Sequence, residues 1–104
     1  MKIIWSIPSF LDLDNIKNYI KKDSIYYANS FICKIINFTE KLENFPEIGR
    51  IVPEYNNKEL KEIIYKNYRI IYKIDYNKKN IYILAIIHAS RDLKKVIENL
   101  EDSI

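Results

Sequence analysis

Basic side chains on a strand-like segment are the first candidates for polar chemistry in this sequence. Arg69 and Lys73 share one parity of an alternating run, so both would lie on the same face of a strand, where they could contact a phosphate or an acidic partner. Lys58, Lys61 and Lys66 form a second basic group that could serve acidic partners or RNA. Arginines on a sheet face also form structural ion pairs, and lysines around a hairpin are often only solvated. A binding role and a purely structural role therefore both stay open for these residues.

The sequence contains one histidine, His88, and one cysteine, Cys33. An imidazole can act as an acid or a base near neutral pH, although a histidine that ends an apolar strand more often bonds a neighbouring backbone group. One histidine and one cysteine cannot furnish a zinc site of the usual ligand count, and a single cysteine cannot form an internal disulfide. We therefore expect no metal or other cofactor, and we expect Cys33 to be buried and inert within a helix.

The elements that would position these residues begin with an apolar, β-branched segment at residues 2–7, which predicts a short strand closed by Pro8. Ser9 is the expected cap of a first helix, and Asp23 or Ser24 of a second helix that Pro46 ends. In the first helix the residues at helical spacing are Phe10, Leu13, Ile16 and Ile20; in the second they are Ala28, Phe31, Ile35, Phe38, Leu42 and Phe45. The first half of the chain thus predicts a helical hairpin.

The second half predicts strands. A polar connection at residues 46–58, with a candidate strand at 50–52, leads to β-branched and aromatic segments at 60–65, 67–75 and 81–87, typical of an antiparallel meander. In the middle segment Tyr68, Ile70, Tyr72 and Ile74 share one face and Arg69, Ile71, Lys73 and Asp75 the other. Trp5, Tyr68 and Tyr72 are expected in the core. A short C-terminal helix is predicted by the spacing of Leu93, Val96, Ile97 and Leu100.

Length and composition agree with one folded domain. The 104 residues include 48% hydrophobic and 30% charged residues, a balance that argues against disorder. We predict a single α+β domain over residues 1–104, in the order β-α-α-β-β-β-α, with the helical hairpin packed on one face of a twisted antiparallel sheet and the other face left open. The net charge of +3 mildly favours a polyanion or an acidic partner. The absence of a signal-like or membrane-spanning apolar run predicts a cytoplasmic protein without membrane contact.

Several short motifs occur in a recognisable order along nearly the whole chain. They are Trp5, the pair Asp12-Leu13, PEIGR at residues 46–50, YRIIY at 68–72 and IHASRDL at 87–93. Together they resemble the RelE/ParE superfamily of type II toxins. The resemblance implies helices packed against a twisted antiparallel sheet, which agrees with the fold predicted from periodicity.

Members of this superfamily act by one of two mechanisms, so the resemblance implies either of them. RelE-like members are ribosome-dependent endoribonucleases that cleave mRNA without a metal, using basic residues to orient a phosphate for attack by the ribose 2′-OH. On that resemblance Arg69 and Arg91 match two arginines of the site and Lys61 is the best match for its lysines, with His88 as the candidate acid or base. ParE-like members bind DNA gyrase and need no catalytic set.

The resemblance to ParE-like chains is the closer of the two. The tyrosine of the RelE-like pattern falls at Ile97, which has no proton to transfer, while the HxxRD ending at residues 88–92 and the apolar last helix are more similar to ParE-like chains. We therefore expect a gyrase-directed toxin, with a ribosome-dependent mRNA endoribonuclease and a non-toxic binding module as alternatives. The resemblance also implies a cognate antitoxin, whose acidic helix or strand would cover the open face, and no small-molecule cofactor.

Overall fold

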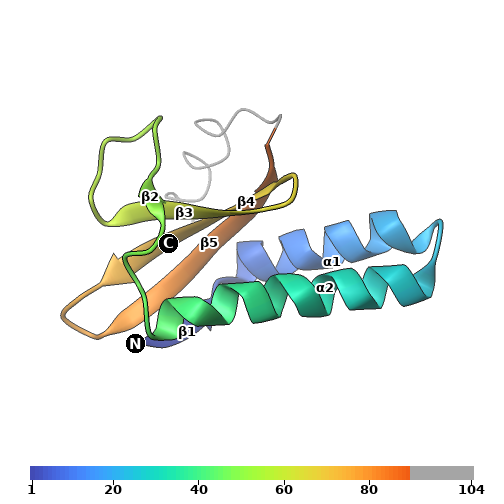
Figure 1. Cartoon of the computed structure of the whole chain (residues 1–104), viewed down its shortest axis with the longest axis horizontal. Coiled ribbons are helices and arrows are strands. Elements are labelled where there is room, and N and C mark those ends of the chain that lie inside the picture. The colour runs from blue at the N-terminus through green and yellow to red at the C-terminus, as the bar shows by residue number, and fades with distance from the viewer. Residues whose placement is uncertain (90–104) are drawn as a thin grey trace.

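The computed structural model describes residues 1–89, and Figure 1 shows two long helices beside a sheet. The predicted C-terminal helix and Arg91 lie outside these residues. The predicted order of the remaining elements is confirmed, and the candidate strand near residue 50 is present. The elements are β1 (Lys2–Trp5), α1 (Ile7–Lys21), α2 (Ile25–Glu40), a 3-10 helix (Lys41–Glu43), β2 (Arg50–Ile51), β3 (Leu60–Tyr65), β4 (Tyr68–Asp75) and β5 (Asn80–His88).

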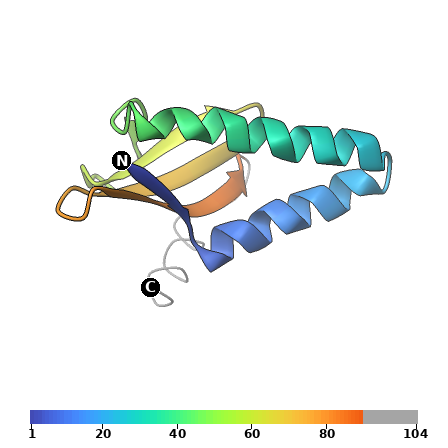
Figure 2. The same cartoon turned by 90° about the horizontal axis from the view of Figure 1, so that it is seen from below.

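The five strands form one sheet in the order β1-β5-β4-β3-β2. β3, β4 and β5 make the predicted antiparallel meander, but β1 pairs with β5 in parallel, so the sheet is mixed and the expectation of a wholly antiparallel sheet is wrong at this edge. A parallel pair needs a long crossover between its strands. The helical hairpin and the other strands supply it, and Figure 2 shows β1 leading directly into α1.

The helices begin at serine caps. Ser6 caps α1 by accepting a hydrogen bond from the backbone N–H of Ser9 at 3.2 Å, so Ser9 is not the cap that the sequence predicted. Pro8 then lies in the first turn, where a helix needs no N–H donor. Ser24 caps α2 through the N–H of Tyr27, as predicted.

The α2 helix is shorter than predicted. It ends at Glu40, and the 3-10 helix that follows ends before Pro46. Phe10 and Phe45, which were expected on the apolar stripes, are 65% and 63% exposed. Cys33 is also exposed, contrary to prediction. It follows Phe31 by two residues, about 200° around the helix axis, so it points away from the core that Phe31 enters.

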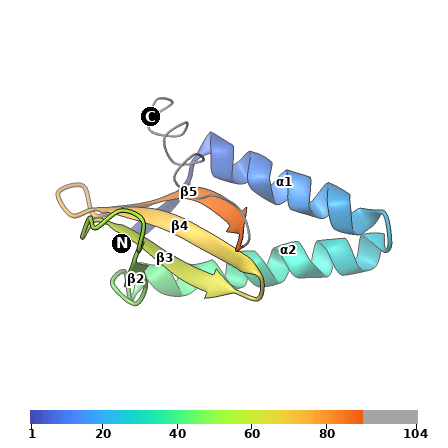
Figure 3. The ribbon, with the colours of Figure 1, turned by 90° about the horizontal axis from the view of Figure 1, so that it is seen from above.

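The main core lies between the hairpin and one face of the sheet. Figure 1 shows both helices on the same side of the strands, and Figure 3 shows the hairpin reaching beyond the sheet. The expected parity of β4 is confirmed, because three of its alternate residues enter this core. The buried members are Leu13, Ile16, Phe31, Ile35, Leu42, Ile63, Ile70, Tyr72, Ile74, Ile81, Ile83 and Ile86, with Trp5 and Tyr68 packed against them.

The second face of the sheet carries its own apolar cluster. We call it the second cluster: Val52, Leu60, Ile71, Leu84, Ala85 and Ile87, with Tyr55 and Tyr82 packed against it. Leu84 and Ala85 both belong to it because the register of β4 with β5 shifts between Ile71 and Tyr72. The prediction of an open face is therefore wrong at its centre. Figure 1 shows the connection between β2 and β3 rising on this side.

Neither of the two long helices combines the length and the apolar character that crossing a membrane requires.

Candidate functional site

Four charged side chains meet on the face of the sheet opposite the hairpin. We call them the arginine–glutamate cluster: Arg50 of β2, Glu54 of the β2–β3 connection, Glu62 of β3 and Arg69 of β4. Arg69 donates from Nη1 and Nη2 to the two carboxylate oxygens of Glu54 at 2.9 and 3.0 Å. Its Nε donates to one oxygen of Glu62, and the Nε of Arg50 donates to the other at 2.7 Å. Each carboxylate is thus held by at least one guanidinium.

Strand register brings these residues together. Arg50 lies directly opposite Glu62 in the β2–β3 pair. Glu62 faces Ile71 and Ile64 faces Arg69, which makes Glu62 and Arg69 diagonal neighbours on one face. Neither glutamate was predicted as a site residue from the sequence. The alternation of β3 could have revealed Glu62, because it shares the parity of the apolar Leu60 and therefore has to be buried and paired.

The cluster is buried to different depths. The side chain of Glu62 is 0% exposed, that of Arg69 is 10% exposed and that of Glu54 is 28% exposed. The pKa of Arg69 is raised, and the hydrogen bond to Glu54 is the largest cause. Burial acts in the opposite direction, and the hydrogen bond and charge of Glu62 raise the pKa further. The hydrogen bond between Arg69 and Glu54 lowers the pKa of Glu54. Both charges therefore persist over a wider pH range than those of free side chains, and the positive charge of Arg69 is already compensated.

The structure separates the residues that were expected to act together. Arg69 points away from the hairpin, as predicted. Lys61 pairs with Tyr72 and so lies on the opposite parity of the sheet, and His88 pairs with Tyr68 on that same parity. The rings of His88 and Tyr68 are 5.5 Å apart between centroids. Lys61 and His88 therefore lie on the other face of the sheet from Arg69.

The PEIGR segment has a structural role at the edge of this site. The Tyr72 hydroxyl donates to the carbonyl oxygen of Pro46 at 2.8 Å and accepts from the N–H of Gly49 at 3.0 Å. Burial raises the pKa of Tyr72 to about 12. These bonds fix the chain just before Arg50, and so they position the segment that carries Arg50 and Glu54 into the arginine–glutamate cluster.

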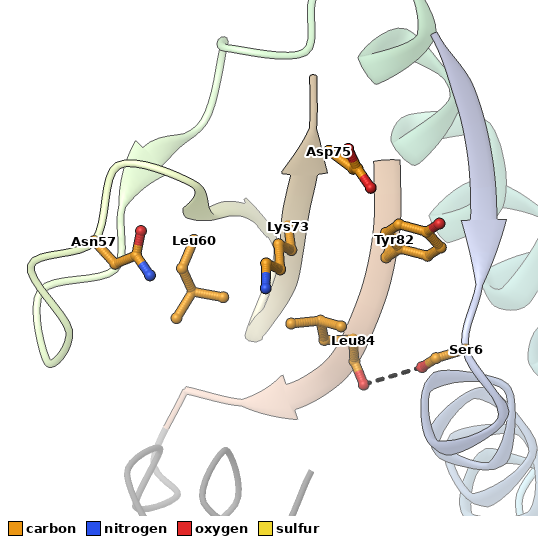
Figure 4. Close-up of a pocket in the computed structure, with 7 residues that line it drawn as sticks. All are labelled: Ser6, Asn57, Leu60, Lys73, Asp75, Tyr82 and Leu84. Atoms are coloured by element: carbon orange, nitrogen blue, oxygen red, sulfur yellow. Dashed lines mark hydrogen bonds between the residues drawn. The ribbon is translucent and has the colours of Figure 1, made fainter. Parts of the chain in front are cut away.

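A cavity of about 520 Å³ continues the second face of the sheet. Figure 4 shows Lys73 between Leu60 and Leu84, with Tyr82 beside Leu84 and Asp75 at the upper end of the group. The remaining lining residues are Ser6 and Asn57. Leu60 and Leu84 also belong to the second cluster, so this cavity joins an apolar wall to one ammonium group and one carboxylate. An apolar wall with a few polar groups is typical of ligand-binding pockets.

Within residues 1–89, no three His, Cys, Asp or Glu side chains are grouped so that they could hold a metal ion.

Comparisons with known proteins relate this geometry to a family. The family model of the ParE toxin of the type II toxin–antitoxin system parDE matches residues 3–93. The fold is similar to a chain of a chromosomal ParDE toxin–antitoxin system from P. aeruginosa, with a TM-score of 0.72, 18% identity, and coverage of 86% of this chain and 97% of that one. No significant match is found among curated proteins.

A second solved structure is also similar, a chain of the RelBE2 toxin–antitoxin complex from Mycobacterium tuberculosis. Its TM-score is 0.61 at 17% identity, over 84% of this chain and 95% of that one. At such identities the two structural likenesses show a shared fold. The match of the family model over residues 3–93 goes further and bears out the resemblance found in the sequence: the chain belongs to the ParE toxin family of type II toxin–antitoxin systems.

Proposed function

We propose that this toxin inhibits growth by binding DNA gyrase in the cytoplasm and that a cognate antitoxin neutralises it. The observation that carries the proposal is the engagement of Arg69 by two carboxylates, Glu54 and Glu62. Cleavage of mRNA would need uncompensated cations around the phosphoryl oxygens, whereas binding to a protein target needs none. The separation of Lys61 and His88 from Arg69 supports the same choice.

Purified toxin should inhibit supercoiling of a relaxed plasmid by gyrase, and prior addition of the antitoxin should restore it. Relaxation of the same plasmid by a type I topoisomerase is the matched control, because a toxin that merely coated DNA would slow both enzymes. Full gyrase activity at micromolar toxin excess would contradict the proposal.

A second candidate is a ribosome-dependent mRNA endoribonuclease with Arg69 and Arg91 as phosphate contacts and Lys61 and His88 as the further candidates. The solvent exposure of Arg50, at 62% of its side chain, favours it by providing a cation beside Arg69. Translating ribosomes with toxin should then yield codon-linked cuts that Arg69→Ala abolishes, and intact mRNA would exclude this mechanism.

The third candidate is a non-toxic binding module that keeps the fold and the partner surface. Here the arginine–glutamate cluster would serve stability alone, as its burial suggests. Induced expression without the antitoxin separates this candidate from the other two, because a module without a target leaves growth unchanged and a toxin arrests it.

A further inference from the structure

The two carboxylates on Arg69 differ in how firmly the fold holds them. Glu62 belongs to β3, is fully buried and is shared with Arg50. Glu54 belongs to the β2–β3 connection and is partly exposed, and the two hydrogen bonds that its side chain forms within residues 1–89 both go to Arg69. Glu62 is therefore a fixed part of the sheet, whereas Glu54 can leave without breaking a strand.

The connection that carries Glu54 also contributes to the second cluster. Val52 is buried in that cluster and Tyr55 packs against it, so apolar side chains flank Glu54 in the sequence. On the sheet, Ile87 is the register partner of Arg69, and Ile71 is the next residue on the same face of β4. Displacement of the connection would thus uncover a guanidinium and an apolar surface beside it.

We propose that Glu54 is an internal placeholder, filling a carboxylate-binding site on Arg69 that an acidic, partly apolar segment of the antitoxin takes over. This inference rests on the antitoxin partnership of the proposed function, but it requires no particular toxin target. The pair of Nη groups already holds a carboxylate in the two-point geometry that a partner's aspartate or glutamate would adopt. When a partner's carboxylate replaces that of Glu54, Arg69 keeps the same number of hydrogen bonds. The free-energy cost is then mainly that of moving the β2–β3 connection.

The surroundings favour a polypeptide over a nucleic acid. Glu62 stays bound to Nε of Arg69 whatever Glu54 does, so Arg69 offers one two-point position for a single carboxylate and no continuous row of cations for a phosphate chain. The second cluster offers apolar contact to side chains that a phosphate backbone lacks. Lys73 lies on the same face of β4 as Arg69, in the cavity that Leu60 and Leu84 line. The face therefore presents a guanidinium, then the apolar second cluster, then an ammonium group. This sequence of groups matches an acidic amphipathic segment.

The test compares Glu54→Gln with Glu59→Gln, because both remove one negative charge from the same connection and Glu59 is exposed. The probes are a fluorescent random copolymer of glutamate and tyrosine and, separately, poly-uridylate, followed by anisotropy. Glu54→Gln should bind the copolymer at least about tenfold more tightly than Glu59→Gln, the value of one charge-assisted hydrogen bond. Adding Arg69→Ala to Glu54→Gln should remove the gain.

Equal affinity of the two variants for the copolymer would overturn the proposal. A larger gain for poly-uridylate would overturn it as well, in favour of a nucleic-acid site. If Glu54→Gln does not fold, hydrogen exchange on the wild-type chain decides: the copolymer should accelerate exchange at residues 52–59, and unchanged exchange would count against the inference. Neither readout uses gyrase or growth, so a failure of the gyrase proposal remains distinguishable.

Discussion

Gly49 and Tyr72 are in contact so close that the glycine leaves no room for a side chain. A Cβ atom at Gly49 would lie 2.5 Å from Oη of Tyr72 and 2.6 Å from the backbone oxygen of Glu62. The N–H of Gly49 meanwhile donates to the same Tyr72 oxygen at 3.0 Å. The glycine of the PEIGR segment is therefore required by packing against β3 and β4, and through this contact the segment that enters the arginine–glutamate cluster is positioned.

Gly49→Ala should lower the free energy of unfolding by about 1–3 kcal/mol, the usual cost of overpacking a filled site. Urea unfolding followed by circular dichroism measures it. In the Tyr72→Phe background the same substitution should cost less, because the phenylalanine lacks the oxygen that the new Cβ would meet. Strictly additive costs in the double variant would show that the contact does not limit this position.

Glu62→Ala should be the most damaging of the single substitutions in the cluster. It leaves the buried Nε–H of Arg69 without an acceptor while the Nη groups stay paired with Glu54, and an unsatisfied buried donor costs about 1–3 kcal/mol. Thermal or urea unfolding measures the loss of stability. The control is Glu59→Ala, because Glu59 is exposed and lies three residues away, so its substitution should change the free energy of unfolding by close to zero. Equal losses for the two variants would argue against a structural role of the cluster.

The lowered pKa of Glu54 predicts a pH dependence of stability. Its folded-state pKa lies below the ordinary value of 4.5, so its contribution is fully present above that value and is lost as pH falls through the lowered pKa. The difference in unfolding free energy between wild type and Glu54→Gln should therefore stay constant from pH 6 to 8 and shrink below about 4.5. A difference that instead grows as the solution is acidified would contradict the ion pair with Arg69.

Asp12 of α1 binds the backbone of β5 at a residue beyond the last pair that β5 forms with β1. Its carboxylate accepts a hydrogen bond from the N–H of Ile86 at 2.9 Å, and the backbone and hydroxyl of Ser6 bond the carbonyl oxygens of Ile83 and Leu84. Asp12→Ala should lower the free energy of unfolding by about 1–3 kcal/mol, because the N–H of the buried Ile86 loses its acceptor. Amide exchange at Ile86 should accelerate, whereas Asp14→Ala, an exposed residue on the same helix, should leave it unchanged.

Local sequence patterns sufficed for much of the fold. The alternation through β4 placed Ile70, Tyr72 and Ile74 toward the hairpin and Arg69 away from it, since side chains of a strand point to opposite faces in turn. The helical hairpin and the meander followed from apolar spacing and from turn residues between segments. The length of α2 and the cap of α1 were predicted less well, because helix ends depend on single hydrogen bonds such as that between Ser6 and Ser9.

The polar site depended on contacts between segments. The sequence identified Arg69 as a charged residue on the second face, but only strand register places Glu62 beside it, and only the path of the β2–β3 connection brings Glu54 onto its Nη groups. Register likewise moved Lys61 and His88 to the other face. Periodicity reports which way a side chain points along its own strand. Which charges it meets depends on pairing between strands distant in the chain, and that pairing is decided by the packed tertiary structure.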